Sequence, residues 1–171
     1  YGQLGKEGAV PVMQRALEAF QRAGDLEGQA LALANLGAVC RWAGRWDEAL
    51  SYYERGRDAN SKIGNTLGAA LAPINMAEVL IDRGEWAEAE ALLLGTLPFW
   101  KASQHRYFLA ACHAQLGRVS LRTGRLDEAL SRLEEAKAGF LHVGADQEIP
   151  DVDAWIAECR VAMGKADIAL D

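Results

Sequence analysis

The sequence lacks the features that mark membrane, disulfide-stabilised and nucleic-acid-binding proteins. It contains no apolar run of the roughly 18 residues that suggest a membrane span. The three cysteines, Cys40, Cys112 and Cys159, form no C-x-x-C pair and are odd in number, so a disulfide framework is not expected. The formal net charge is −6 and no basic stripe is present, which argues against DNA or RNA as a partner. We therefore expect a cytoplasmic protein with reduced, buried thiols and no membrane or nucleic-acid partner.

Motifs of catalysis and metal binding are also missing. There is no G-x-S-x-G, no H-E-x-x-H and no glycine-rich loop ending in Gly-Lys-Ser/Thr. His105, His113 and His142 do not share a metal-ligand spacing. Cys112 and His113 are adjacent, and neighbours on a helix point about 100° apart, so they do not readily hold one ion. We therefore expect no enzyme activity, no metal site and no cofactor.

The strongest positive feature is an internal repeat of 40 residues. Four series of residues recur at this spacing, and segments 44–51 and 124–131 are nearly identical. The series are Gly44, Gly84, Gly124 and Gly164; Ala49, Ala89, Ala129 and Ala169; Leu36, Met76, Leu116 and Ile156; and Gly37, Ala77, Gly117 and Ala157. A fixed period of this kind indicates a repeat architecture, in which one supersecondary unit is stacked many times.

Each repeat reads as a pair of helices. Leu33, Leu36 and Cys40 recur at three and four residues, which is the spacing of one helix face. Gly44 permits the left-handed conformation that ends a helix, and Gly24 followed by Asp25 is typical of a stop and a new N-cap. The second glycine series, at 24, 64 and 144, is broken only by Gln104. The pattern predicts first helices at 26–42, 66–82, 106–122 and 147–163, and second helices at 8–23, 47–63, 87–103 and 127–143.

Small residues have a predicted packing role between the two helices of a pair. Glycine or alanine after the Leu36-type residue lets the partner helix approach closely, and the alanine series presents the matching flat surface. The segments Leu33-x-x-Leu36-Gly37-x-x-Cys40 and Ala49-x-x-x-Tyr53 resemble the tetratricopeptide repeat pattern. The period exceeds the usual repeat of about 34 residues, and the closing proline is absent. The resemblance implies an all-α, right-handed α-solenoid of antiparallel helical hairpins that serves as a binding scaffold.

The resemblance covers almost the whole chain, so we expect a single array over residues 1–171. Both ends cut the repeat, and the chain starts at Tyr1 rather than at a methionine, so we expect the natural protein to continue beyond one or both ends. The predicted divisions are a partial repeat 1–24, repeats 25–64, 65–104 and 105–144, and a partial repeat 145–171.

The candidate binding surface is the concave side that the first helices of such an array line. Amides recur there at 35, 75 and 115, and an amide offers both a donor and an acceptor to an extended peptide. In similar peptide-binding arrays an asparagine stands just before the Leu-Gly pair, as Asn35 does here. An equally weighted interpretation is that these amides orient their own helix neighbours. The candidate groove residues are Asn35, Trp42, Asn75, Glu78, Asp82, Gln115, Arg118, Arg122 and Trp155.

The charged and aromatic candidates have specific predicted roles. Glu78 and Asp82 share one helix face, as do Arg118 and Arg122, because each pair is spaced by four. These patches either pair with each other or fix the register of a partner that carries both signs. Trp42 would supply an apolar anchor at one end of the groove, and Trp155 at the other.

Two functions remain open at this point. The first is a protein- or peptide-binding scaffold that uses the groove. The alternative is a ligand-sensing or self-associating arm of a larger bacterial signalling protein, such as a transcription regulator or nucleotide cyclase, with self-association through the array ends.

Overall fold

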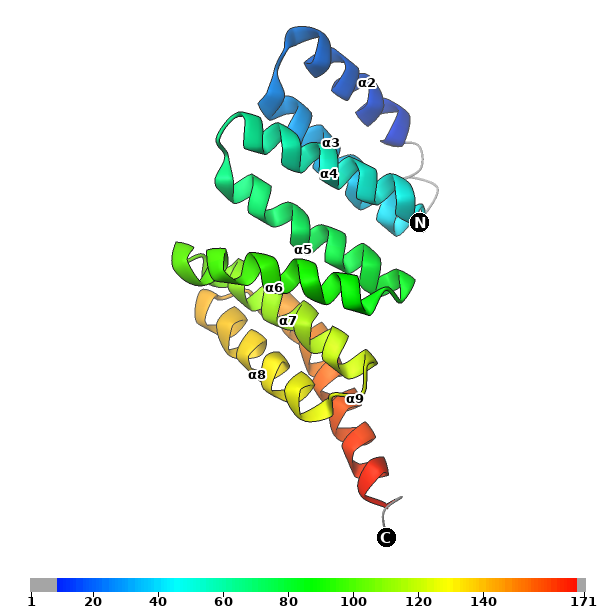
Figure 1. Ribbon diagram of the computed structural model, residues 1–171, viewed down its shortest axis with the longest axis vertical. Coiled ribbons are helices and arrows are strands. Elements are labelled where there is room, and N and C mark those ends of the chain that lie inside the picture. The colour runs from blue at the N-terminus through cyan, green and yellow to red at the C-terminus, as the bar shows by residue number, and fades with distance from the viewer. Residues whose placement is uncertain (1–8, 169–171) are drawn as a thin grey trace. The chain divides into compact units, whose positions relative to one another are not determined.

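The computed structural model describes residues 9–168, with side chains for residues 10–164, and the chain divides into two compact units at residues 1–83 and 84–171. The first unit holds four helices, which are α2 (Ala9–Ala23), α3 (Leu26–Trp42), α4 (Trp46–Lys62) and α5 (Thr66–Arg83). Consecutive helices are joined by two or three residues and pack against each other, which makes each neighbouring pair antiparallel (Figure 1).

The second unit repeats the same plan. It holds α6 (Trp86–Ser103), α7 (Arg106–Arg122), α8 (Leu126–Val143) and α9 (Ile149–Ile168), with a short 3-10 turn, η1 (Asp146–Glu148), before α9. Here too each helix packs against the next one along the chain. No strand occurs among residues 9–168, so the all-helical class and its hairpin architecture are confirmed. The prediction that both units form one continuous array stays a prediction.

The helix bounds follow the sequence pattern closely. The predicted first helices 26–42 and 106–122 match α3 and α7, the predicted start at 66 matches α5, and the remaining predicted starts differ from the observed ones by one or two residues. Gly24 has φ +68°, and the Gly28 N–H donates to Asp25 Oδ1 at 2.9 Å, which is the expected stop followed by an N-cap. The expected ends of the array, residues 1–8 and 169–171, lie outside the described residues.

One expected break is wrong. Gly164 belongs to the glycine series that ends first helices, yet α9 continues through it to Ile168. Glycine permits a left-handed turn but does not force one, because it also populates the helical region. Lys165 and Ala166 follow it, and both residue types favour helix. Helix propensity therefore permits α9 to continue, whereas at Gly124 a turn forms despite the helix-favouring Arg125 and Leu126, because α8 packs back on α7 there.

The packing role of the small residues is confirmed inside both units. Ala49 and Ala129 have no exposed surface. A Cβ added at Gly37 would lie 2.6 Å from the ring of Tyr53, and one added at Gly117 would lie 2.7 Å from Cγ of Leu133. The large residue of the second helix thus occupies the space that a side chain on the first helix would need.

We expect Gly117→Ala to lower the free energy of unfolding by about 1–3 kcal/mol, because the added methyl group would displace Leu133 and its backbone, whose N atom lies 3.3 Å away. Gly95→Ala, in the interior of α6, is the matched control. A Cβ there meets nothing within 4 Å, so the variant should gain about 0.5–1 kcal/mol of helix propensity. Urea denaturation followed by circular dichroism measures both, and equal stability of the two variants would contradict the packing assignment.

Gln104 generates a second prediction, because it interrupts the glycine series while keeping the left-handed conformation, with φ +58°. A side chain at such a position costs about 1–2 kcal/mol. Gln104→Gly should therefore stabilise the protein by about 0.5–1 kcal/mol, after the larger unfolded-state entropy of glycine is subtracted. The reciprocal variant Gly144→Gln, where φ is +71° and no atom crowds the Cβ position, should lose a similar amount in thermal melts.

Candidate partner-binding groove

A groove of about 310 Å³ lies in the first unit, bounded by α3, α4 and α5. Its apolar wall includes Leu31 and Ala34 from α3 and Leu71 from α5. Leu31 is 64% exposed, although it is a large aliphatic side chain on a well-packed helix. A single exposed leucine is common, but one that lines a concave surface is typical of a ligand site.

The helix periods explain why these side chains meet. On α3 the core takes Leu33, Leu36 and Cys40, each at most 3% exposed, which turns the neighbouring stripe with Leu31 toward the groove. On α4, Tyr53, Arg57 and Asn60 follow one face at spacings of four and three and line the same groove. The groove is therefore formed by both helix types of the repeat.

Two of the asparagines that line the groove are used by the fold itself. Asn60 Nδ2 donates to the Gly56 carbonyl at 3.1 Å, and Asn65 Nδ2 donates to Asn60 Oδ1 at 2.9 Å. The Gly68 N–H in turn donates to Asn65 Oδ1 at 3.0 Å, which makes Asn65 the N-cap of α5. These contacts fix the turn between α4 and α5.

The two predicted amides of the first unit are placed differently. Asn75 lines the groove and is half-buried, whereas Asn35 is exposed on α3. Neither side chain forms a hydrogen bond with another residue in the described part of the chain. No described residue therefore occupies their amide donors and acceptors.

The acidic pair of the first unit is bound internally. Arg41 of α3 donates to both carboxylates of α5, through Nη1 to Glu78 and through Nε to Asp82 at 2.9 Å. The side chains of all three residues are only 21–26% exposed. Trp42, next in sequence, is 69% exposed, with the Arg41 guanidinium 5.8 Å from its ring centroid. Arg41 thus holds two successive first helices together, and we call this contact the Arg41 clamp.

The candidates of the second unit are also engaged with one another. Gln115 is only 7% exposed, and its Oε1 accepts a hydrogen bond from Arg118 Nη1 at 2.8 Å. The Arg118 guanidinium lies 4.9 Å from the ring centroid of Trp155, which itself packs against the core of the unit. The structure therefore places Gln115 below the surface and Trp155 under an arginine, rather than both in the open.

Arg122 forms the second interhelical pair of charges. Its Nη1 and Nη2 donate to the two carboxylate oxygens of Glu158 on α9, the latter contact at 3.3 Å. The pair joins the first helices of successive repeats, as the Arg41 clamp does in the first unit. In both units, charges that the sequence suggested for partner recognition bind their own chain.

The groove residues of the second helix were missed by reasoning from the first helices alone, and three of them carry polar side-chain groups. Tyr53, Arg57 and Asn60 all come from a second helix. Their spacing of four and three was visible in the sequence and could have placed them on one face. The partners of Arg41 could not be found in this way, because they depend on which of several acidic residues its long side chain reaches.

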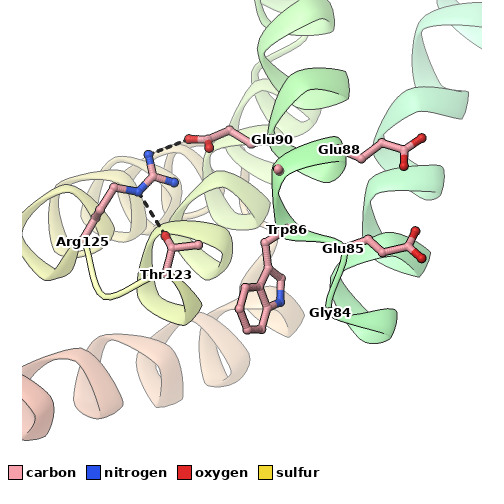
Figure 2. Close-up of a pocket in the computed structure, with 8 residues that line it drawn as sticks. Gly84, Glu85, Trp86, Glu88, Glu90, Thr123 and Arg125 are labelled. Atoms are coloured by element: carbon pink, nitrogen blue, oxygen red, sulfur yellow. Dashed lines mark hydrogen bonds and ion pairs between the residues drawn. The ribbon is translucent and has the colours of Figure 1, made fainter.

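A second hollow, of about 650 Å³, lies in the second unit at the start of α6 (Figure 2). Arg125 lies at its edge and is fully engaged, with Nη1 2.7 Å from Glu90 and 3.1 Å from Glu128, and Nε 3.0 Å from Thr123 Oγ1. Figure 2 shows the side chains of Glu85 and Glu88 pointing away from Arg125. Because its only cation is satisfied and its carboxylates do not converge, this hollow is the weaker candidate.

The cysteine thiols and His113 do not line either hollow. Burial raises the pKa of the Cys112 thiol to about 12, and burial also raises the pKa values of Cys40 and Cys159. Burial lowers the pKa of His113, whose Nδ1 lies 3.0 Å from a carboxylate oxygen of Glu135. Among the described residues no group of three His, Cys, Asp or Glu side chains could hold a metal ion. Within the same residues, every helix is too short or too polar to cross a membrane.

Together, the paired helices and the groove between them define a helical repeat scaffold. The sequence pattern of the tetratricopeptide repeat matches residues 1–62 and 68–141, and the chain belongs to this family. Such repeats generally bind protein or peptide partners, and proteins of this family are typically scaffolds without catalytic activity.

Solved structures share the fold. RapI in its apo form matches with a TM-score of 0.78 at 16% identity, over 97% of this chain and 46% of RapI, so the chain spans about half the length of that protein. A kinesin-light-chain-type protein of Podosopora anserina with nearly identical TPR-like repeats matches with a TM-score of 0.64 at 15% identity, over 96% of this chain and 90% of that chain. A variant of the latter gives a TM-score of 0.65. No curated protein sequence matches the chain.

The Arg41 clamp predicts a stability effect. Arg41→Ala should lower the free energy of unfolding by about 1–2 kcal/mol, because two partly buried carboxylates lose a shared cation. The loss should shrink in high salt. Arg45→Ala is the control, since Arg45 makes only an exposed pair with Glu48 and should change stability by less than about 0.5 kcal/mol. Urea denaturation at two salt concentrations measures both variants, and equal losses would contradict the clamp.

Proposed function

We propose that the chain is a partner-binding module and that the groove of the first unit takes an extended peptide or protein segment. The observation that carries the proposal is the combination of an apolar wall, formed by Leu31 and Leu71, with the Asn75 amide that no described residue binds. An apolar surface takes a partner side chain, and an amide can both donate to and accept from its backbone.

The charges around the groove suit a segment rather than a small ion. Glu27 and Arg57 line the same hollow and carry opposite signs. The Arg57 side chain is 40% exposed, and its nearest carboxylate is that of Asp58, at 3.6 Å. A peptide with one basic and one acidic side chain around an apolar residue would complement this arrangement, and such rim charges mainly set orientation and association rate.

The other predicted site residues are proposed as additional contacts, and the proposal does not depend on them. Asn35 and Trp42 are exposed on α3, the helix that supplies Leu31, and could prolong the contact along it. Gln115, Arg118, Arg122 and Trp155 in the second unit remain proposed contacts of a longer partner. Because all four are engaged with their own unit, a partner would have to displace existing interactions to use them.

The alternative function, a sensing arm of a larger bacterial signalling protein, would use the same groove for a small ligand. The similar RapI structure is an apo form, which fits a fold with a ligand-bound state. That comparison does not distinguish a peptide from a metabolite. Binding measurements with peptides decide between the two.

The test is a displayed library of random peptides screened against the whole chain, followed by fluorescence anisotropy on the enriched sequences. We expect Leu31→Glu to weaken binding by at least tenfold, since it puts an unpaired charge on the apolar wall. Asn75→Ala should weaken it about threefold to tenfold through the loss of a hydrogen bond. Leu141→Glu on α8, another exposed leucine, is the control and should not change affinity. Unchanged affinity in both groove variants would move the site elsewhere.

A further inference from the structure

The outward face of α6 differs in chemistry from the same face of the other second helices. Position by position, the 40-residue repeat lets α4, α6 and α8 be compared directly. At three equivalent exposed positions, α4 and α8 carry the same acidic, hydroxyl and acidic residues, whereas α6 carries only apolar ones. These are Asp47, Ser51 and Glu54 on α4, Asp127, Ser131 and Glu134 on α8, and Ala87, Ala91 and Leu94 on α6.

The apolar character continues along the helix. Leu94 is 45% exposed, and Gly95 and Pro98 beside it are also exposed. Together with Ala87 and Ala91 they follow spacings of three and four, so they form one uncharged stripe about three turns long. A surface helix normally turns a polar face to solvent, as α4 and α8 do. We call this stripe the α6 face.

Gly95 gives a second, independent indication. A Cβ added there would meet nothing within 4 Å, whereas one at Gly117 would collide with Leu133. The packing of this chain therefore does not need glycine at position 95. Glycine inside a helix costs about 1 kcal/mol relative to alanine, so its presence calls for another reason. Close approach of a second backbone from outside is such a reason.

We propose that the α6 faces of two copies of this chain pack against each other as a two-fold dimer. A partner for an uncharged, small-residue face must itself be narrow and uncharged, and the second helices α4 and α8 are polar at the equivalent positions. In an isologous contact the same face supplies both sides. Ala91 and Gly95 of one copy let the helices come close, and Leu94 fills the space beside them.

The flanking charges select the antiparallel orientation. Glu90 and Lys101 lie on the same flank of α6, about three turns apart. In an antiparallel pair centred near Gly95, each Lys101 comes beside the Glu90 of the other copy. Glu90 shares Arg125 with Glu128, and Glu128 also lies 3.8 Å from Arg132, so Glu90 does not have a cation to itself and its carboxylate can take the lysine as a second partner. A parallel pair would instead bring Glu88 of one copy beside Glu90 of the other, which is repulsive.

The size of the face sets the strength of the contact. α6 has 18 residues and is therefore about 27 Å long. One helix face buries well below the roughly 800 Å² per partner of a stable complex. The dimer should be weak and concentration-dependent, with a Kd on the order of 10–100 μM.

The first test uses the triple variant Ala87→Asp, Ala91→Ser and Leu94→Glu. It gives the α6 face the residues that α4 and α8 carry at the equivalent positions. Folding should therefore be retained, as circular dichroism would check. Sedimentation equilibrium of the whole chain up to about 1 mM should show a dimer for the parent and at least tenfold weaker association for the variant. The control Leu141→Glu, on exposed surface of α8, should dimerise like the parent.

The second test concerns orientation. Lys101→Glu should weaken the dimer about threefold to tenfold by turning two attractions into repulsions, and Lys101→Arg should preserve it. A parent chain that stays monomeric at every concentration overturns the proposal. So does a dimer that the triple variant leaves intact. A dimer that is lost in the triple variant but unaffected by Lys101→Glu overturns the antiparallel arrangement.

Discussion

The close contact between the two helices of a pair is the constraint on which the rest of this structure depends. At Gly37 and Gly117 the first helix offers no side chain, and the space is taken by Tyr53 and Leu133 of the second. This contact sets the distance between the helices and so decides which residues are covered and which remain on the surface. The stripe with Leu31 is exposed because the neighbouring stripe of α3 is fully used in this contact and in the core.

Electrostatic contacts play a secondary but consistent role between repeats. Arg41 joins α3 to α5, and Arg122 joins α7 to α9, each from the last turn of a first helix to an acidic residue of the next one. Because cations are favoured near helix C-termini, these arginines are well placed before any partner residue is considered. Charges on the concave side of a repeat protein are therefore not free for recognition by default. In this chain the apolar wall and the unbound amides are better candidates for recognition.

Much of the fold could be predicted from the sequence, and less of the site. The bounds of α3 and α7 follow from the glycine series and the apolar spacing, since both are local and repeat at 40 residues. The burial of the Gln115 side chain could not be predicted, because it depends on whether a neighbouring helix covers it. More residues are buried on α7 than on α3. The continuation of α9 through Gly164 was missed for a related reason, since a glycine permits a turn without forcing one, and the packing of the next helix decides whether the turn forms. Long side chains such as Arg41 add a further uncertainty, as several partners lie within their reach.

A repeat protein also supplies its own reference for interpreting single residues. Where α4 and α8 agree on a polar residue and α6 departs from them, the difference does not follow from the 40-residue repeat, in which all three are second helices. Leu94 and Gly95 each carry a cost, because Leu94 leaves 45% of its surface exposed and Gly95 loses helix propensity at a position where a Cβ would meet nothing within 4 Å. Asn75 differs, because asparagine and glutamine also stand at the equivalent positions 35 and 115, so it follows the repeat. Departure from the repeat therefore supports the α6 face as a dimer contact. The groove is supported as a partner-binding site by its shape and by its unbound amide. Since the two inferences rest on different kinds of observation, either can fail without weakening the other.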